Sequence, residues 1–319
     1  MHYKHVPVLL SEVMELLDPR PGQNYIDCTM GGGGYTLAIA ERIRPGKIIS
    51  IDLDQSAINN LRTVIAKNQN KYQNIIIVND NFKNLQYIYN EQIEKEEIGY
   101  LDGIVLDLGL SSAQLQDPNR GFSFQVDAPL DMTFGQTADS LSAEDILNNS
   151  KQVELEKIIK DYGEEKFYRT IARKIIDYRR KNCIKTTGQL LDIIRQATPP
   201  RYRFDSKIHF ATRTFQALRI AVNQELDNLN QVLPQAIDIL RPGGKIAVVS
   251  YHSLEDRIVK NFFRHESKDC LCPPQQPVCS CTHQARLMII NRKIITPTAD
   301  EITNNPRSRS AKLRVAQKS

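Results

Sequence analysis

Apolar runs alternate with amphipathic helical segments over the first 110 residues, and this alternation constrains the fold more than any other feature. Four runs resemble buried strands, at residues 25–28, 47–54, 74–80 and 101–112. Each contains an apolar run rather than an alternation of apolar and polar residues, so both faces of each strand would be covered. Between them lie helical segments such as residues 11–18, with apolar side chains spaced by three and four and Ser11 as the expected N-cap. The pattern predicts a parallel α/β sheet with helices on both faces.

The rhythm changes between Ser112 and Thr212, where charged helical segments follow one another without a strand. Ser142 is the expected N-cap of one of these helices. The sequence therefore predicts an all-helical insertion over residues 113–212, within an α/β domain made of residues 1–112 and 213–319. In that second part we expect a long helix over 212–240, broken near Pro234, then a Pro-Gly-Gly turn and a fifth strand. The last segments, 285–297 and 307–317, read as two strands that pair antiparallel.

Composition narrows the class of protein. The chain has 319 residues, of which 41% are hydrophobic and 25% charged, as in soluble globular proteins. The first 18 residues lack the pattern of a secretory signal, and no uninterrupted apolar run reaches 18 residues. We therefore expect a cytoplasmic protein without a membrane span. The net charge of +5 is too small to demonstrate a nucleic-acid partner by itself.

Four of the six cysteines are concentrated in residues 270–281, CLCPPQQPVCSC. Two C-x-C pairs can supply the four thiolates of a tetrahedral Zn²⁺ site, although the usual gap within each pair is two residues. The candidate ligands are Cys270, Cys272, Cys279 and Cys281. A reduced loop that binds nothing, or a site that uses His283, is an open alternative, and a disulfide is disfavoured in a reducing compartment.

The run Gly31–Gly34 follows the first strand, and Asp52 ends the second. This arrangement is typical of a bound nucleoside, because glycines let backbone approach the ligand and a carboxylate accepts ribose hydroxyls. A phosphate-binding P-loop is disfavoured, since no Gly-Lys-Ser/Thr closes the turn. Both NAD and S-adenosylmethionine fit, and the absence of G-x-G-x-x-G weakens the NAD interpretation. A plain turn residue is the alternative role for Asp52.

Several longer blocks resemble one family. The segment ILRPGGKIAVVS is similar to the turn and fifth strand of many S-adenosylmethionine-dependent methyltransferases. LDLGLSSAQLQDPNRGFSF, YGEEKFYRTIARKI, SYHSLEDRIVK and NPRSRSAKLR resemble the small-subunit ribosomal RNA cytosine-N4-methyltransferases, the RsmH or MraW family. The resemblance runs from His5 to the C-terminus. It implies a Rossmann-like methyltransferase sheet with an inserted all-helical domain, and methyl transfer to the N4 amine of a cytosine in 16S ribosomal RNA near the decoding site.

The resemblance also implies contacts with S-adenosylmethionine. The expected cofactor-binding residues are Gly31, Gly33, Gly34, Tyr35, Asp52, Phe82, Asp107 and Gln114. Among them, Asp52 would hold the ribose hydroxyls and Phe82 would pack on the adenine. Phe82 could instead belong to the core, which is the commoner place for an aromatic residue after a strand.

The expected catalytic residues are Asp107 and His252. The N4 amine of cytosine is a weak nucleophile, so acceptors for its N–H bonds are needed as the nitrogen becomes tetrahedral. The Asp/Asn-Pro-Pro-aromatic motif of other amino-methyltransferases is absent here, where Asp107-Leu108-Gly109-Leu110 stands. Stacking on the base would come from Phe122, Phe124 or Tyr251. His252 accepts the proton in one interpretation, and in the other it orients substrate or caps the next helix.

Basic clusters suggest where RNA would be gripped: residues 179–181, 200–204 and 306–314, with Arg213 and Arg219. We assign the helical insertion to RNA positioning, with small-subunit ribosomal RNA or the 30S subunit as partner. A solvated helix face is the alternative for each cluster. Two other functions stay open: a non-catalytic RNA-binding protein on a methyltransferase fold, and an NAD-dependent dehydrogenase. The sequence does not indicate the oligomeric state.

Overall fold

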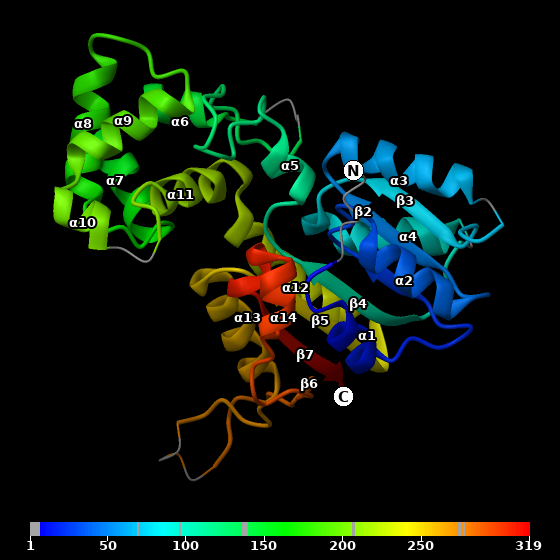
Figure 1. Cartoon of the computed structure of the whole chain (residues 1–319). Helices are drawn as coiled ribbons and strands as arrows, with labels where there is room; N and C mark the ends of the chain where they lie inside the picture. Colours follow the sequence, from blue (N-terminus) through cyan, green and yellow to red (C-terminus); the bar gives the residue numbers. More distant parts are fainter. Residues whose placement is uncertain are drawn as a thin grey trace. The chain divides into compact units, whose positions relative to one another are not determined.

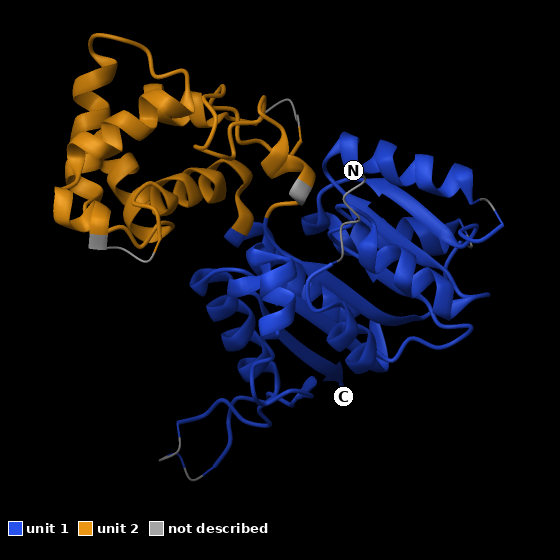
Figure 2. Cartoon of the chain, in the orientation of Figure 1, with its two compact units in different colours: residues 1–109, 226–319 blue, residues 110–225 orange. Residues whose placement is uncertain are grey.

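The computed structural model describes residues 7–68, 70–95, 97–135, 140–205, 208–273, 276 and 278–319. The chain forms two compact units (Figure 2). The sheet unit contains residues 1–109 and 226–319, and the helical unit contains residues 110–225.

The sheet unit is built on seven strands in the order β3-β2-β1-β4-β5-β7-β6 (Figure 1). The strands are β1 (Tyr25–Asp27), β2 (Ile48–Asp52), β3 (Ile75–Asn79), β4 (Leu101–Asp107), β5 (Leu240–Ser250), β6 (Leu287–Ile289) and β7 (Lys312–Lys318). Strands β1 to β5 are parallel, and β7 pairs antiparallel with both β5 and β6. The predicted parallel sheet and the antiparallel pairing of the last two strands are confirmed.

Helices cover both faces of this sheet. Successive residues of a strand point to opposite faces, so the apolar strands present side chains to both, and each face packs against helices. In β4, Ile104 and Leu106 join a core that includes side chains of α4, α12 and α13. Val105 points the other way, into a core that includes side chains of α1 and α2. The helices of this unit are α1 (Leu10–Leu17), α2 (Gly34–Ile43), α3 (Gln55–Lys67), α4 (Leu85–Glu94), α12 (Glu225–Ile239), α13 (Ser253–Glu266) and α14 (Ala299–Asn304), with short 3₁₀ helices η1 (Phe82–Asn84) and η2 (Pro306–Ser310). The result is the predicted α/β, Rossmann-like architecture.

The helical unit has its own apolar core, lined by residues such as Leu155, Ile171 and Leu190, all fully buried. Its helices are α5 (Ser112–Gln116), α6 (Ala143–Asn149), α7 (Gln152–Asp161), α8 (Tyr168–Arg179), α9 (Thr187–Ala197), α10 (Pro200–Asp205) and α11 (Thr212–Asn223). Ser142 caps α6 as predicted, with its hydroxyl accepting the backbone N–H of Asp145. No described residue between 110 and 225 belongs to a strand.

Two local predictions were wrong. Ser11 does not cap α1, because the helix begins one residue earlier and Leu9, in a left-handed conformation, occupies the N-cap. Pro234 lies inside α12 without ending it. The break falls instead at Gln224, whose φ of 51° ends α11.

The unit boundaries also differ from the predicted ones. They fall at 109/110 and 225/226 rather than at 112/113 and 212/213. The second difference arises because α11 packs into the helical core through Phe215, Leu218 and Val222. Periodicity had placed this helix with the sheet, since its apolar spacing continues without interruption into α12.

The longest described helix, α12, has 15 residues, whereas about 20 apolar residues are needed to span a bilayer. Within the described residues, no helix combines the length and apolar character that crossing a membrane requires.

Candidate cofactor and catalytic site

Three carboxylates end three adjacent strands of the sheet. Asp27 ends β1, Asp52 ends β2 and Asp107 ends β4. The strand order β2-β1-β4 makes these strands neighbours, and all three are parallel. The carboxylates therefore lie at one edge of the sheet, the carboxyl edge, where open α/β sheets bind ligands.

The glycine-rich loop after β1 is bonded to both neighbouring strands. On one side, the Asp107 N–H donates to the Thr29 hydroxyl at 2.6 Å. On the other side, the Gly31 N–H donates to Asp52 Oδ2 at 2.7 Å. The loop thus runs along the carboxyl edge in a fixed conformation, and it links the predicted ribose acceptor to the predicted catalytic carboxylate.

Asp27 anchors this loop through side-chain hydrogen bonds. It was not identified from the sequence as a site residue. Its side chain is fully buried, accepting the Thr36 hydroxyl at 2.7 Å and the Thr29 N–H at 3.1 Å. Thr36 also bonds the Ser50 hydroxyl at 2.9 Å, which connects α2 to β2. Burial raises the pKa of Asp27 to about 6, although these hydrogen bonds oppose the shift. A carboxylate inside an otherwise apolar strand was the signal that could have identified it.

Asp52 uses both carboxylate oxygens to hold backbone. Oδ2 accepts from Gly31, and Oδ1 accepts the Asp54 N–H at 2.8 Å. Burial raises the pKa of Asp52, and the same two N–H groups counteract the rise. Each carboxylate oxygen has a second lone pair, so the fixed carboxylate can also accept ribose hydroxyls.

Glycine is required at different positions of this run for different structural reasons. Gly31 and Gly33 have φ of 48° and 79°, the left-handed region that glycine adopts without strain. At Gly34 a Cβ atom would lie 2.0 Å from Cγ of Pro7. Part of the glycine requirement is therefore packing within the protein rather than space for a ligand.

Tyr35 and Phe82 differ in how accessible they are. The Tyr35 side chain is buried, and its hydroxyl donates to the Val8 carbonyl. Any contact of Tyr35 with a ligand would thus be through backbone in the first turn of α2. Phe82 opens η1 just past β3 and is half-buried, packing against the core beneath α4 and α12. Phe82 thus combines the core role with an exposed part that a ligand could contact.

Asp107 is bonded to Tyr251, which follows β5. The Tyr251 hydroxyl donates to Asp107 Oδ1 at 2.8 Å. Burial raises the pKa of Asp107 to about 7, with the Tyr251 bond opposing the rise and Asp27 and Glu255 adding to it. The pKa of Tyr251 also lies well above its ordinary value, chiefly because the phenol is buried. Among the described residues, no hydrogen bond to Asp107 Oδ2 is formed.

His252 takes the capping role that the sequence left open. It is the N-cap of α13, and its Nδ1 accepts the Glu255 N–H at 3.4 Å. Its Nε2 lies 3.1 Å from Glu255 Oε1, so both ring nitrogens face the same residue. Glu255 in turn accepts the Tyr251 N–H at 2.8 Å. His252 therefore contacts Glu255, and Glu255 holds the backbone of Tyr251.

The remaining predicted residues lie in the helical unit. Gln114 forms a capping box with Ser111, each backbone N–H donating to the side chain of the other. Phe122 is buried in the helical core, and Phe124 stacks on His209 with ring centroids 4.5 Å apart. Both phenylalanines are therefore engaged by other side chains of the helical unit.

The basic residues divide into internal and exposed groups. Arg179 donates to the Leu147 carbonyl, and Arg213 donates to the Glu164 carbonyl. Arg219 forms a two-bond ion pair with Glu225. These three are structural. The exposed basic residues on α8, its C-terminal end and α10 are Arg169, Arg173, Lys174, Arg180, Lys181 and Arg201.

The C-terminal basic segment is also partly used within the sheet unit. Arg314 donates to Asp256 on α13 at 2.7 Å, and Lys312 lies 3.5 Å from the same carboxylate. These two ion pairs lower the pKa of Asp256 even though burial acts in the other direction. They tie β7 to α13, so these two cations stabilise the fold.

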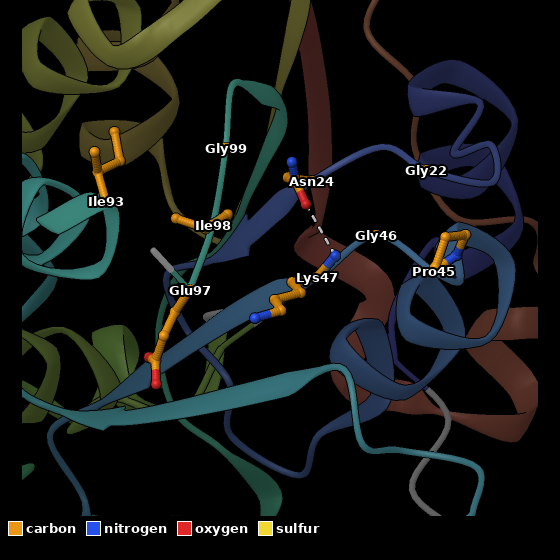
Figure 3. A pocket seen from close by; sticks show the side chains of 9 residues that line it. All are labelled: Gly22, Asn24, Pro45, Gly46, Lys47, Ile93, Glu97, Ile98 and Gly99. Atoms are coloured by element: carbon orange, nitrogen blue, oxygen red, sulfur yellow. Dashed lines mark hydrogen bonds between the residues drawn. The ribbon is translucent and has the colours of Figure 1, made fainter. Parts of the chain in front are cut away.

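A pocket of about 500 Å³ lies where β1, β2 and β4 begin (Figure 3). Lys47 and Glu97 carry opposite charges at its wall, and the Lys47 N–H donates to the Asn24 side chain at 2.9 Å. Since ligands of open α/β sheets bind at the carboxyl ends of strands, this amino-edge pocket is not the predicted cofactor site.

Comparison with known proteins agrees with the geometry. The family model described as the MraW methylase family matches residues 2–319. Ribosomal RNA small subunit methyltransferase H of Dehalococcoides mccartyi is 48% identical over an alignment covering 100% of this chain and 87% of that one. The protein of the same name from Heliobacterium mobile is 46% identical, with 100% of both chains covered. The chain belongs to the MraW methylase family.

Proposed function

We propose that this protein transfers a methyl group from S-adenosylmethionine to the N4 amine of a cytosine in small-subunit (16S) ribosomal RNA. The observation that carries the proposal is the carboxyl edge of the sheet. There one fixed loop joins a ribose acceptor, Asp52, to a buried carboxylate, Asp107, whose pKa is about 7. Membership of the MraW methylase family and the names of its relatives support the same reaction.

The residues present fit S-adenosylmethionine. Asp52 offers lone pairs to ribose hydroxyls, and Phe82 presents a half-buried ring past the end of the adjacent strand. Gly33 leaves its backbone uncovered by a side chain, and only glycine fits there, because its φ is positive and a Cβ would meet Leu61 at 2.9 Å. When bound, S-adenosylmethionine supplies an electrophilic methyl group.

Asp107 then acts on the nucleophile. The Tyr251 hydroxyl occupies Oδ1, which leaves Oδ2 to accept an N–H bond of the cytosine amine. As the amine becomes tetrahedral it grows more acidic, and the carboxylate takes its proton at Oδ2. Asp107 is thus the acceptor, Tyr251 positions it, and the pair Glu255 and His252 positions Tyr251. The target base must leave any stack to reach this buried group.

Two experiments separate the proposal from its alternatives. Mass mapping of ribosomal RNA nucleosides, in cells with and without this protein, should show one N4-methylated cytidine site that depends on it. An unchanged map would favour a non-catalytic RNA-binding protein. Calorimetric titration should show binding of S-adenosylmethionine, and binding of NAD alone would indicate a dehydrogenase instead.

The rate of methyl transfer should rise with pH through about 7, because Asp107 must be a carboxylate to accept the proton and its pKa is about 7. The Tyr251 hydrogen bond favours the charged carboxylate. We therefore expect Tyr251→Phe to raise the pKa and move the rising limb to higher pH. The measurement is the single-turnover rate against pH with saturating S-adenosylmethionine and small-subunit ribosomal RNA.

The phenylalanine variant keeps the ring, so its packing should be preserved while the hydroxyl alone is lost. Its deficit relative to the unaltered protein should be larger at pH 6 than at pH 8.5. A rate that is lowered equally at every pH, with the midpoint unmoved, would mean that Tyr251 does not act through Asp107.

We assign RNA positioning to the helical unit. Exposed cations lie at the C-terminal end of α8 and on α10, and α10 also carries Phe204, whose side chain is 83% exposed and available to stack on a base. Replacing Lys181 and Arg201 with alanine should weaken RNA binding and make its salt dependence shallower by about one to two units of slope. Fluorescence anisotropy at several salt concentrations measures both effects.

A matched control removes two exposed lysines from the sheet unit: Lys67, the last residue of α3, and Lys95, the C-cap of α4. The control should leave the salt slope unchanged. Both double variants should bind S-adenosylmethionine within about twofold of the unaltered protein, since independent sites are additive. If both double variants weaken RNA binding equally, these cations contribute to RNA affinity through the overall charge of the protein, and the helical unit has no dedicated RNA-binding surface at these residues.

A further inference from the structure

The loop between α13 and β6 lacks the usual means of holding a conformation. None of its described residues, 268–273, 276 and 278–286, lies in a helix or strand, and none is buried. Its larger apolar side chains face solvent, with Val278 73% exposed. An exposed loop without an apolar core needs another source of order.

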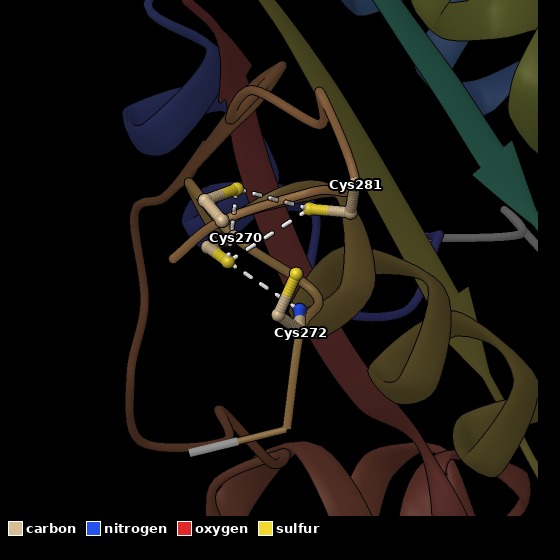
Figure 4. A group of neighbouring side chains, drawn as sticks. Cys270, Cys272 and Cys281 are labelled. Carbon is tan, nitrogen blue, oxygen red and sulfur yellow. Dashed lines mark hydrogen bonds between the residues drawn. The ribbon is translucent and has the colours of Figure 1, made fainter. Parts of the chain in front are cut away.

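Four cysteines of this loop converge (Figure 4). The Sγ atoms of Cys270, Cys272, Cys279 and Cys281 all lie within 4.8 Å of one another. Cys279 Sγ lies 3.5 Å from Cys270 Sγ and 3.6 Å from Cys281 Sγ, and the Cys270 and Cys281 sulfurs are 3.8 Å apart. These separations are far above the roughly 2.05 Å of a disulfide bond, and all four thiols are free.

The spacing matches a tetrahedral metal site. Four sulfurs placed about 2.3 Å from a central Zn²⁺ in tetrahedral geometry lie about 3.8 Å from one another. Thiolates packed this closely without a cation would repel, whereas a bound divalent ion offsets half of their charge and attracts all four. His283, the alternative ligand considered from sequence, does not belong to the converging group, and its ring packs edge-on against His265.

Backbone donors complete the surroundings of the sulfurs. The Leu271 N–H donates to Cys281 Sγ at 3.3 Å, and the Ser280 N–H donates to Cys272 Sγ at 3.4 Å. Cys270 Sγ accepts the Cys272 N–H, also at 3.4 Å. Such N–H groups stabilise metal-bound thiolates and fix their orientation. The C-x-C spacing makes these bonds possible. The N–H of the residue between two cysteines, Leu271 or Ser280, donates to a cysteine of the other pair, and the Cys272 N–H donates to the first cysteine of its own pair.

We infer that the four cysteines bind one structural Zn²⁺ as a closed tetrathiolate site. Four protein ligands leave no open coordination position, so the ion would order the loop rather than take part in methyl transfer. The ion would hold the segment that connects α13 to β6, at the edge of the sheet where β6 pairs with β7.

The test uses the full chain purified without chelator. Elemental analysis should find about one zinc per chain, and a mercurial reagent should release it with stoichiometric thiol titration. Cobalt exchanged into the site should give the visible bands of tetrahedral thiolate coordination. Cys270→Ser with Cys281→Ser should abolish bound zinc, whereas Cys183→Ser, which removes an exposed thiol from the helical unit, should retain it.

Two outcomes would overturn the inference. One is metal-free protein whose four loop thiols react freely with a thiol reagent in the folded state. The other is recovery of disulfides among these four cysteines from protein prepared under reducing conditions, which would indicate a redox pair. Measurements on the unaltered chain decide the matter even if the double serine variant fails to fold, since release by mercurial and cobalt exchange need no substitution.

Discussion

Asp107→Asn should lower the single-turnover rate of methyl transfer by about 10²- to 10⁴-fold, the usual contribution of a positioned general base. Asparagine has nearly the same shape, and its side-chain oxygen can still accept the Tyr251 hydroxyl in place of Oδ1. What it lacks is the ability to take a proton at pH 7. The rate should therefore fall far more than the affinity for S-adenosylmethionine, which calorimetry measures on the same protein.

Stability provides an internal check on this variant. The pKa of Asp107 is raised from 3.8 to about 7, so the folded protein loses stability as pH rises between these two values, and the cost of ionising the buried carboxyl is fully present above about 7. Asparagine removes that cost, so the midpoint temperature of thermal unfolding at pH 8 should be the same as in the unaltered protein or higher.

The matched control is Asp102→Asn, at the other end of the same strand, where Asp102 accepts the Asn24 N–H and pairs with Arg241. It should transfer methyl groups normally. If Asp107→Asn retains full activity, proton acceptance belongs to another group, and the assignment of Asp107 is wrong.

The alternation of apolar runs and helices predicted the sheet unit closely, because buried parallel strands need apolar residues on both faces. Strand β1, for example, was expected at residues 25–28 and spans Tyr25–Asp27. The partners of β7 were harder to predict. Its antiparallel pairing with β6 could be expected because these are the last two apolar runs of the chain, but its insertion beside β5 depends on tertiary packing that no local pattern shows.

Backbone features that depend on unusual residues were missed. Glutamine rarely adopts positive φ, so nothing in the sequence indicated that Gln224 would separate α11 from α12. A proline was instead expected to break the helix, yet Pro234 lies within α12. The second boundary, predicted at 212/213 and found at 225/226, was misplaced because of this single error.

The candidate site was predictable where one residue acts alone, and less so where residues act through one another. Asp52 could be named from its place at a strand end after the glycine run, whereas Asp107 follows from the resemblance to the family. The Asp27–Thr36–Ser50 network and the Tyr251–Asp107 bond join residues up to 144 positions apart in the chain. For His252, sequence left a proton acceptor and a helix cap equally open, and only the coordinates show its Nδ1 capping α13.

Asp52→Ala should weaken S-adenosylmethionine binding by about 1.5–3 kcal/mol, or roughly 10- to 150-fold, because a charged acceptor of hydrogen bonds is lost. Calorimetric titration measures the change. The substitution has two possible routes of action, since Asp52 also accepts the Gly31 and Asp54 N–H groups and thereby holds the loop. Asp54→Ala provides a neighbouring control: it removes the N-cap of α3, at a cost of about 1 kcal/mol in stability, but leaves the Asp52 carboxylate in place.

A cofactor analogue without ribose hydroxyls separates the two routes. If Asp52 binds the ribose, the 2′,3′-dideoxy analogue should bind the unaltered protein much more weakly than S-adenosylmethionine does, whereas the Asp52→Ala variant should bind both ligands about equally. The coupling energy of this cycle then equals the ribose interaction. If the variant discriminates between the two ligands as strongly as the unaltered protein does, Asp52 acts only by holding Gly31. The ribose acceptor must then be another group at the carboxyl edge of the sheet.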